Sequence, residues 1–263
     1  MTKPIPVPIG TQTMKISPIT LDAANFQQVK QHIMHHLNPP DDWTYQTGQS
    51  TYLWFTNNQR LSLYADVVSL NSEVDFLSEA FQRRVHPKAA KPLLVKAIEG
   101  RFNKPLTILD ATVGLGQDAM TLCYRGHQVT GIEQNPYVYL LLKDGCYRFS
   151  QHTTNPLLLD SIIWADSLSW LSEQPNDYDV IYLDPMFPER KKSAKVKKNM
   201  QLLQQLLGHQ TNIETLLAQA LQRAKKKVVL KRPIDAPILS IPGYQPIHYR
   251  GKTNRFDVYP THF

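Results

Sequence analysis

The sequence predicts an α/β protein, in which a mostly parallel sheet ends in an antiparallel C-terminal hairpin and follows a small N-terminal α+β subdomain. From residue 106 onward, apolar runs of strand length alternate with helical patterns, which is typical of a parallel sheet covered by helices on both faces. Ahead of that region, apolar alternation around a polar turn predicts a separate unit of short strands. We therefore expect the subdomain to span residues 1–92 and the main domain to span residues 93–263.

The N-terminal elements are a hairpin and a helix. From about Tyr52, the alternating runs TYLWF and RLSLYAD flank the polar turn TNNQ, and this pattern predicts a β-hairpin. The stretch LSEAFQRRV predicts a helix with a basic end. The first fifteen or so residues are proline-rich, so we expect them to form a flexible tail.

The main domain alternates strands and helices. The expected strands are LTILD, QVTGIE, SIIWAD, DVIYLD and KKVVLK, followed by a hairpin of YQPIHYR and RFDVYPTHF. The expected helices are DAMTLCYRG, about Pro136 to Phe149, roughly Ala194 to Leu207, and Ile213 to Arg223. Sheets of this kind bind ligands outside the carboxyl ends of their strands, so the residues that follow each strand are the candidates for function.

Composition narrows the class of protein. Hydrophobic residues make up 42% of the 263 residues, which is enough for a packed core. The first residues lack the apolar segment of a signal peptide, and no apolar run is long enough for a transmembrane helix. We therefore expect a soluble cytoplasmic protein, with Cys123 and Cys146 as reduced thiols in the core. The net charge of +7 favours polyanionic partners.

Three successive strand ends carry groups that suit one nucleoside ligand. Gly114 and Gly116 follow the first strand, where they permit a tight turn and close approach of a ligand. Glu133 ends the second strand, where an acid can accept both ribose hydroxyls. Asp166-Ser167 ends the third, where a carboxylate can accept from an adenine amino group. Together these positions predict a shared nucleoside site.

The same loop leaves a second interpretation open. Gly114, Gly116 and Ala119 also satisfy the G-x-G-x-x-A pattern of dinucleotide-binding proteins, so a nicotinamide-dependent oxidoreductase is an alternative. Asp110 lies four residues before the first glycine, and a carboxylate there would repel a pyrophosphate. This position counts against a dinucleotide.

The fourth strand ends in Asp184-Pro185-Met186-Phe187. This motif resembles the [DN]-P-P-[FYW] loop of methyltransferases that act on exocyclic amino groups of bases. Such an amino group is a poor nucleophile, because its lone pair is delocalised into the ring. Asp184 and a loop carbonyl fixed by Pro185 can accept its N–H groups, and Phe187 can stack on the base. We expect these three residues to be catalytic, mainly by positioning.

Longer blocks resemble the ribosomal RNA small-subunit methyltransferase J family. They are LDATVGLGQDA, IEQNP, YLDPMFPERKKSAKVKKNMQLLQQLLG, VVLKRP and RFDVY, in the expected order from about Phe81 to Tyr259. The resemblance implies a Rossmann-like class I methyltransferase fold, S-adenosyl-L-methionine as donor, and methylation at N2 of a guanosine near the 3′ end of 16S rRNA. The cofactor-binding positions that it implies are Gln117-Asp118, Glu133-Gln134, Asp166-Ser167 and Asp184, in addition to Asp110 and the two glycines.

Two departures from the family pattern are visible. The segment Phe81-Gln-Arg-Arg is followed by VHPKAAKP, without the glycines that are common there, so the role of this segment is open. Asp166 stands where a serine is common, which should change the affinity for the adenine rather than the identity of the ligand.

Basic residues near the strand ends are candidates for phosphate contacts with RNA. They are Arg83, Arg84, Lys191, Lys192, Lys195, Lys197, Lys198, Lys231, Arg232 and Arg255, with Arg250 and Lys252 near the terminal hairpin. We expect 16S rRNA or the small ribosomal subunit as partner, and no metal, membrane or stable protein partner. A third interpretation is an RNA-binding protein that keeps the fold but not the chemistry; the acids and the Asp184 loop count against it.

Overall fold

The computed structural model describes residues 18–48, 51–65, 70–153, 162–173, 178–185 and 212–261. The expected N-terminal tail and the expected helix from Ala194 to Leu207 lie outside the described residues. Within the described ranges, no helix combines the length and the apolar character needed to cross a membrane.

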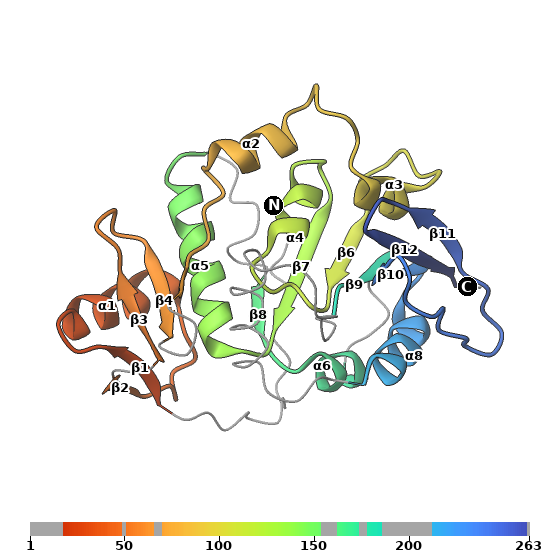
Figure 1. The fold of residues 1–263 in the computed structure, drawn as a ribbon. Coiled ribbons are helices and arrows are strands. Elements are labelled where there is room, and N and C mark those ends of the chain that lie inside the picture. Colours follow the sequence, from red (N-terminus) through yellow and green to blue (C-terminus); the bar gives the residue numbers. More distant parts are fainter. Residues whose placement is uncertain are drawn as a thin grey trace.

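The central sheet has seven strands in the order β11-β12-β10-β9-β6-β7-β8 (Figure 1). Its strands are β6 (Thr107–Asp110), β7 (Gln128–Glu133), β8 (Ile162–Trp164), β9 (Val180–Leu183), β10 (Lys227–Pro233), β11 (Ile247–Arg250) and β12 (Asn254–Pro260). Strands β6 to β10 pair in parallel, whereas β12 runs antiparallel to both β10 and β11. The predicted parallel sheet with its antiparallel terminal hairpin is confirmed. The chain order reverses between β6 and β9, and such a switch point is where open α/β sheets bind ligands.

Helices cover both faces of this sheet. Helices α3 (Leu93–Glu99), α4 (Gln117–Cys123) and α5 (Pro136–Ser150) share one apolar cluster, and α6 (Ser167–Glu173) and α8 (Ile213–Arg223) share the other. In β9, Tyr182 packs into the first cluster and its neighbours Ile181 and Leu183 into the second. Because both faces are buried, the strand is apolar throughout rather than alternating.

A second sheet, of five strands, precedes the central one in the order β2-β1-β3-β4-β5. Its strands are β1 (Ile19–Asp22), β2 (Tyr45–Gly48), β3 (Thr51–Phe55), β4 (Leu61–Ala65) and β5 (Leu70–Ser72), with helices α1 (Phe26–His32), η1 (Ile33–Leu37) and α2 (Glu79–Val85). The predicted hairpin is β3–β4, and α2 is the predicted basic-ended helix. All strands of this sheet lie before residue 93, and the division of the chain into residues 1–92 and 93–263 stays a prediction.

Helix α5 lies between the two sheets (Figure 1), and a buried acid on it fixes it to the N-terminal elements. Asp144 is fully buried, and its carboxylate accepts from His32 Nε2 at 2.8 Å, from the backbone N–H of Leu61 at 3.2 Å and from Arg148 Nε at 2.8 Å. A buried carboxylate is tolerated only when it is paired and hydrogen-bonded, so α1, β4 and α5 are fixed together at this point.

Local sequence explains where the long helices begin. Asn135 and Asn212 each accept two backbone N–H groups at the start of α5 and α8, and Pro136 occupies the first turn of α5. Cys123 and Cys146 are buried and are not joined in a disulfide, as predicted. Burial in apolar surroundings raises the pKa of the Cys123 thiol to about 12, so this thiol is neutral at ordinary pH.

Candidate active site at the carboxyl ends of the parallel strands

The structure brings the candidate acids of the first and fourth strands together at the switch point. Asp110 is the last residue of β6, and Asp184 follows β9 directly. Thr112 connects their loops, because its hydroxyl accepts from the backbone N–H of Asp184 at 2.6 Å while its own N–H donates to Asp110 Oδ1 at 3.1 Å. The Asp184 side chain is 34% exposed, so its carboxylate is reachable from outside.

Asp118, in the first turn of α4, is the centre of a charged network. Its Oδ2 lies 3.0 Å from Lys231 Nζ and accepts from the Tyr182 hydroxyl at 2.7 Å, and its Oδ1 lies 2.5 Å from Arg84 NH2. Lys231 also pairs with Asp184 Oδ2 at 2.7 Å. Although burial acts in the opposite direction, these cations hold the pKa of Asp118 below its usual value.

Asp110 differs from Asp118 and Asp184, because no ion pair reaches it within the described part of the chain. It is 2% exposed. Burial raises its pKa well above the usual value, and Asp118 and Asp184 raise it further. Three carboxyl groups here face two cations, Lys231 and Arg84, so ionisation of all three would leave one negative charge in excess. A cationic ligand group beside Asp110 would neutralise that charge and keep the carboxylate ionised.

Glu133, at the end of β7, is buried and faces the glycine loop. Its Oε2 accepts from the backbone N–H of Gly114 at 3.1 Å, and its Oε1 accepts from that of Asn135 at 2.7 Å. Burial nonetheless raises its pKa to about 7. Each carboxylate oxygen has a second lone pair, so this side chain can still accept the two hydroxyls of a ribose.

The two glycines serve different purposes. Both have positive φ values, 54° for Gly114 and 73° for Gly116, which favour glycine. A Cβ at Gly114 would meet only the Thr112 carbonyl oxygen at 3.9 Å, so the space above it is open for a ligand. A Cβ at Gly116 would come within 2.4 Å of Leu142 Cδ1, so Gly116 lets α4 pack against α5.

The third strand end is partly engaged in local structure. Asp166 Oδ1 accepts from the backbone N–H of Ser169 at 2.9 Å and from its hydroxyl at 3.0 Å, and so caps α6. Ser167 donates to the Ala111 carbonyl of the first loop. Gln117 begins α4, and the Gln134 carbonyl accepts from Trp164 Nε1 at 2.9 Å. These residues border the same strand ends, and their contact with the cofactor stays a prediction.

The structure corrects the role expected for two arginines. Arg232 and Arg255 are 6% and 3% exposed. Arg255 pairs with the fully buried Asp257 and donates to the Ile234 and Ala236 carbonyls at 3.0 and 2.6 Å. Its donors are used inside the protein, so it stabilises the chain after β10 rather than contacting phosphates. Arg232 is likewise buried and donates to the Pro237 carbonyl at 3.3 Å.

The other basic candidates divide by position. Arg83 is 74% exposed at the end of α2, and Arg250 and Lys252 are exposed beside the terminal turn. Arg84 and Lys231 are instead paired with acids of the site. Five lysines and the predicted stacking residue lie outside the described residues: Lys191, Lys192, Lys195, Lys197, Lys198 and Phe187.

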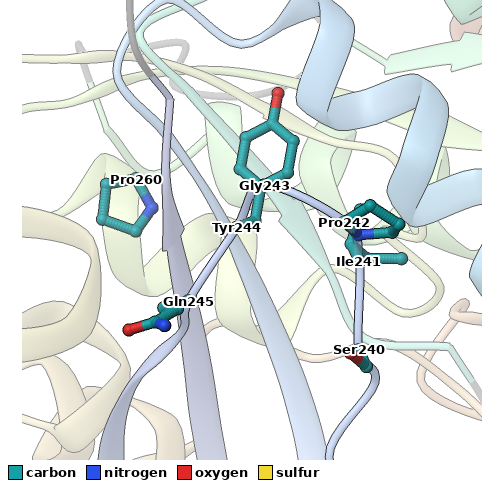
Figure 2. Close-up of a pocket in the computed structure, with 7 residues that line it drawn as sticks. All are labelled: Ser240, Ile241, Pro242, Gly243, Tyr244, Gln245 and Pro260. Atoms are coloured by element: carbon teal, nitrogen blue, oxygen red, sulfur yellow. The ribbon is translucent and has the colours of Figure 1, made fainter.

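The described residues also form a surface hollow in the chain between β10 and β11 and at the end of β12 (Figure 2). It is lined by Ser240, Ile241, Pro242, Gly243, Tyr244, Gln245 and Pro260. None of these residues belongs to the candidate site, and none carries a formal charge. No group of three or more His, Cys, Asp or Glu side chains suited to a metal ion occurs among the described residues.

Comparisons with known proteins agree with this geometry. Residues 41–261 match the family described as "Putative SAM-dependent methyltransferase". A protein named ribosomal RNA small subunit methyltransferase J, from Francisella tularensis subsp. novicida, is 41% identical over 217 residues, which cover 80% of this chain and 88% of the relative. A protein of the same name from Pseudoalteromonas atlantica is 45% identical over 196 residues, 71% of this chain and 75% of the relative.

The fold has a solved relative. The crystal structure of a SAM-dependent methyltransferase from Neisseria gonorrhoeae has a TM-score of 0.62 and 29% identity, with 94% of this chain and 96% of that chain covered. The nicotinamide alternative finds no support, and the cofactor is S-adenosyl-L-methionine. The chain belongs to the family of S-adenosyl-L-methionine-dependent methyltransferases whose curated members are named ribosomal RNA small subunit methyltransferase J.

Proposed function

We propose that this enzyme methylates the exocyclic N2 amino group of a guanosine near the 3′ end of 16S rRNA. The names of the relatives support small-subunit rRNA as the substrate class. One observation supports an amino group as the methyl acceptor. The partly exposed side chain of Asp184, followed by Pro185, lies at the end of β9 beside the glycine loop. The assignment of N2 of a guanosine as the methylated atom rests on the resemblance of the sequence block around Asp184 to the family.

The residues at the strand ends fit the donor. Asp110, buried beside two further carboxyl groups, would hold the cationic amino group of the methionine part. Glu133 would accept the ribose hydroxyls, and Asp166 with Ser167 would border the adenine. When bound, S-adenosyl-L-methionine supplies a methyl group on a sulfonium, and the electron pair of the broken C–S bond stays on sulfur.

The acceptor nitrogen needs help from the chain, because its lone pair is delocalised. Asp184 would accept one of its N–H groups, which favours a pyramidal nitrogen whose lone pair faces the methyl carbon. As the N–C bond forms, the nitrogen loses a proton, and the same carboxylate is placed to receive it. Catalysis would then come mainly from alignment, which can supply about 7–11 kcal/mol of a barrier.

The RNA would approach the edge where the strands end. A base must leave its stack to reach Asp184, and exposed cations are needed for the flanking phosphates. Arg83, Arg250 and Lys252 supply such charge among the described residues, and the lysines from Lys191 to Lys198 would extend it. The substrate would be the rRNA or the small ribosomal subunit, which places the enzyme in the cytoplasm.

The test is methyl transfer from labelled donor to undermethylated small subunits and to their extracted rRNA. Asp184→Ala should reduce turnover by roughly 100-fold or more, because the acceptor nitrogen loses the oxygens that would hold it and take its proton, while S-adenosylhomocysteine still binds. Asp179→Ala is the matched control, since Asp179 precedes the same strand and pairs with Lys226 away from the site. The proposal fails if the wild type transfers no methyl group, and Asp184 is misassigned if its variant keeps full turnover.

A further inference from the structure

Lys231 occupies the centre of the candidate site rather than its surface. It lies near the end of β10, and its side chain is 25% exposed. Its ammonium is 3.0 Å from Asp118 Oδ2 and 2.7 Å from Asp184 Oδ2. The glycine loop and the first turn of α4 are called the cofactor loop below. One cation therefore joins Asp118 of the cofactor loop to the acid that would hold the acceptor nitrogen.

The surroundings of Asp184 make this cation important. Lys231 faces it from β10, whereas the other nearby titratable groups are Asp118 from α4, Asp110 from β6 and Tyr182 from β9. Arg84, on α2, reaches this group only through Asp118. Lys231 is thus the only cation paired directly with Asp184 in the described ranges. Without it, neighbouring carboxylates would repel each other, and one of them would take up a proton.

The pairing also restricts the geometry of Asp184. Lys231 binds Oδ2 of the carboxylate, and Thr112 holds the backbone N–H of the same residue. With its backbone and one oxygen fixed, the carboxylate can present Oδ1 in a constant direction. An ionised carboxylate can accept N–H groups at both oxygens, whereas a protonated carboxyl has turned one of its oxygens into a donor.

We propose that Lys231 is a positioning residue for methyl transfer: it holds Asp184 ionised and oriented toward the acceptor nitrogen, and ties it through Asp118 to the cofactor loop. This inference rests on the proposed function of Asp184. It replaces the expected contact between Lys231 and an RNA phosphate, because the ammonium already has two carboxylate partners.

Three variants separate the possibilities. Lys231→Met keeps the aliphatic stem and removes the charge, and Lys231→Arg keeps the charge. Lys226→Met is the matched control, because Lys226 pairs with Asp179 at the opposite end of the same pair of strands. Circular dichroism and thermal melting check that each variant is folded. The measurements are kcat and KM for small subunits across pH, S-adenosylhomocysteine affinity by calorimetry, and the carboxyl ¹³C titration of Asp184.

Lys231→Met should lower kcat by roughly 10- to 100-fold, as expected for a displaced catalytic group. The pKa of Asp184 should rise by about one unit or more, because the neighbouring cation is lost. The pH at which kcat falls on the acidic side of its profile should therefore rise. Part of the lost activity should return at pH values above that point. Lys231→Arg should keep the acidic fall in kcat at its wild-type pH. Lys226→Met should leave both kcat and its pH profile unchanged.

Other outcomes overturn the proposal. If Lys231→Met weakens S-adenosylhomocysteine binding but keeps kcat at saturation, the lysine is a cofactor ligand. If Lys231→Met weakens only RNA binding and reduces the salt dependence of that binding, the lysine is a phosphate contact. The ¹³C titration does not depend on turnover: an unchanged Asp184 pKa refutes the coupling. If the wild type is inactive on small subunits, the proposed function fails, whereas a raised Asp184 pKa in the variant still supports the coupling.

Discussion

Cofactor affinity should depend on pH through Glu133. Burial raises the pKa of this carboxyl to about 7, although backbone N–H groups of Asn135, Gly114 and Gln134 act in the opposite direction. Ribose hydroxyls that donate to the side chain favour its ionised form. The pKa is therefore raised in the free protein and falls on binding, so binding releases a proton and strengthens as the pH rises through about 7.

The size of the effect follows from the value of the pKa. With a pKa of about 7, about one tenth of the Glu133 side chains are ionised at pH 6 and about nine tenths at pH 8. If only the ionised form binds, the Kd for S-adenosylhomocysteine should fall about tenfold between these pH values, or about 1.4 kcal/mol. Asp110 adds to this dependence, because its pKa is also raised by burial.

Calorimetric titration with S-adenosylhomocysteine at pH 6, 7 and 8 measures both affinity and proton release. Buffers of different ionisation enthalpy give the number of protons released. Glu133→Gln should weaken binding at pH 8 and flatten the pH dependence, and Asp110→Asn isolates the contribution of the second acid. Asp179→Asn, at the other end of β9, should keep the full dependence.

The result that refutes this reasoning is a wild-type Kd that does not change from pH 6 to pH 8, with no proton released. A Glu133→Gln variant with an unchanged slope would show that another group carries the dependence. Asp110 would then be the candidate, and Asp110→Asn should abolish the slope.

Further predictions concern stability and RNA binding. Arg255→Ala leaves Asp257 without its bidentate partner inside the protein, so the free energy of unfolding in urea should fall by about 3–5 kcal/mol. Its cross-strand neighbour Arg250 is exposed, so Arg250→Ala should stay within about 0.5 kcal/mol; equal losses would contradict the burial argument. Asn212→Ala removes the N-cap of α8 and should cost about 1 kcal/mol, visible as a lower urea midpoint. Arg250→Ala should also reduce the salt dependence of rRNA binding by close to one ion, and an unchanged slope would exclude this contact.

The strands of the main sheet could be predicted because their burial leaves a simple pattern. DVIYLD is apolar throughout, since β9 lies between two layers of helices. The strands β1 (ITLD) and β2 (YQTG) were not predicted. Each has only four residues, and the burial pattern of β2 shows no buried position. These strands form because β1 pairs with β2 and β3, a contact that local sequence does not reveal.

The positions of Asp110, Glu133 and Asp184 at strand ends could be predicted from the sequence, but the partners of these acids could not. Side chains alternate along β10, so Lys231 lies on the same face of the strand as Val229. Val229 packs in the cluster that contains Tyr182, whereas Arg232 lies on the opposite face of the strand. This alternation, read from KVVLKRP, was a usable signal that Lys231 and Arg232 have different surroundings. Parallel pairing of Leu230 with Leu183 then puts Lys231 beside Asp184. That register depends on the whole sheet.

The N-terminal segment contributes to the candidate site, although all strands of the second sheet lie before residue 93. Arg84 of α2 supplies one of the two cations of the site through Asp118. Phe76 packs at Gly116, where a Cβ would lie 3.4 Å from its ring, and Val74 packs so closely at Gly145 that a Cβ would lie 2.4 Å from its Cγ1. The segment that carries these residues therefore supports the cofactor loop and α5 directly. Removing it would expose that apolar contact and leave Lys231 as the one cation paired with Asp118 among the described residues, so we expect methyl transfer to require the segment before residue 93.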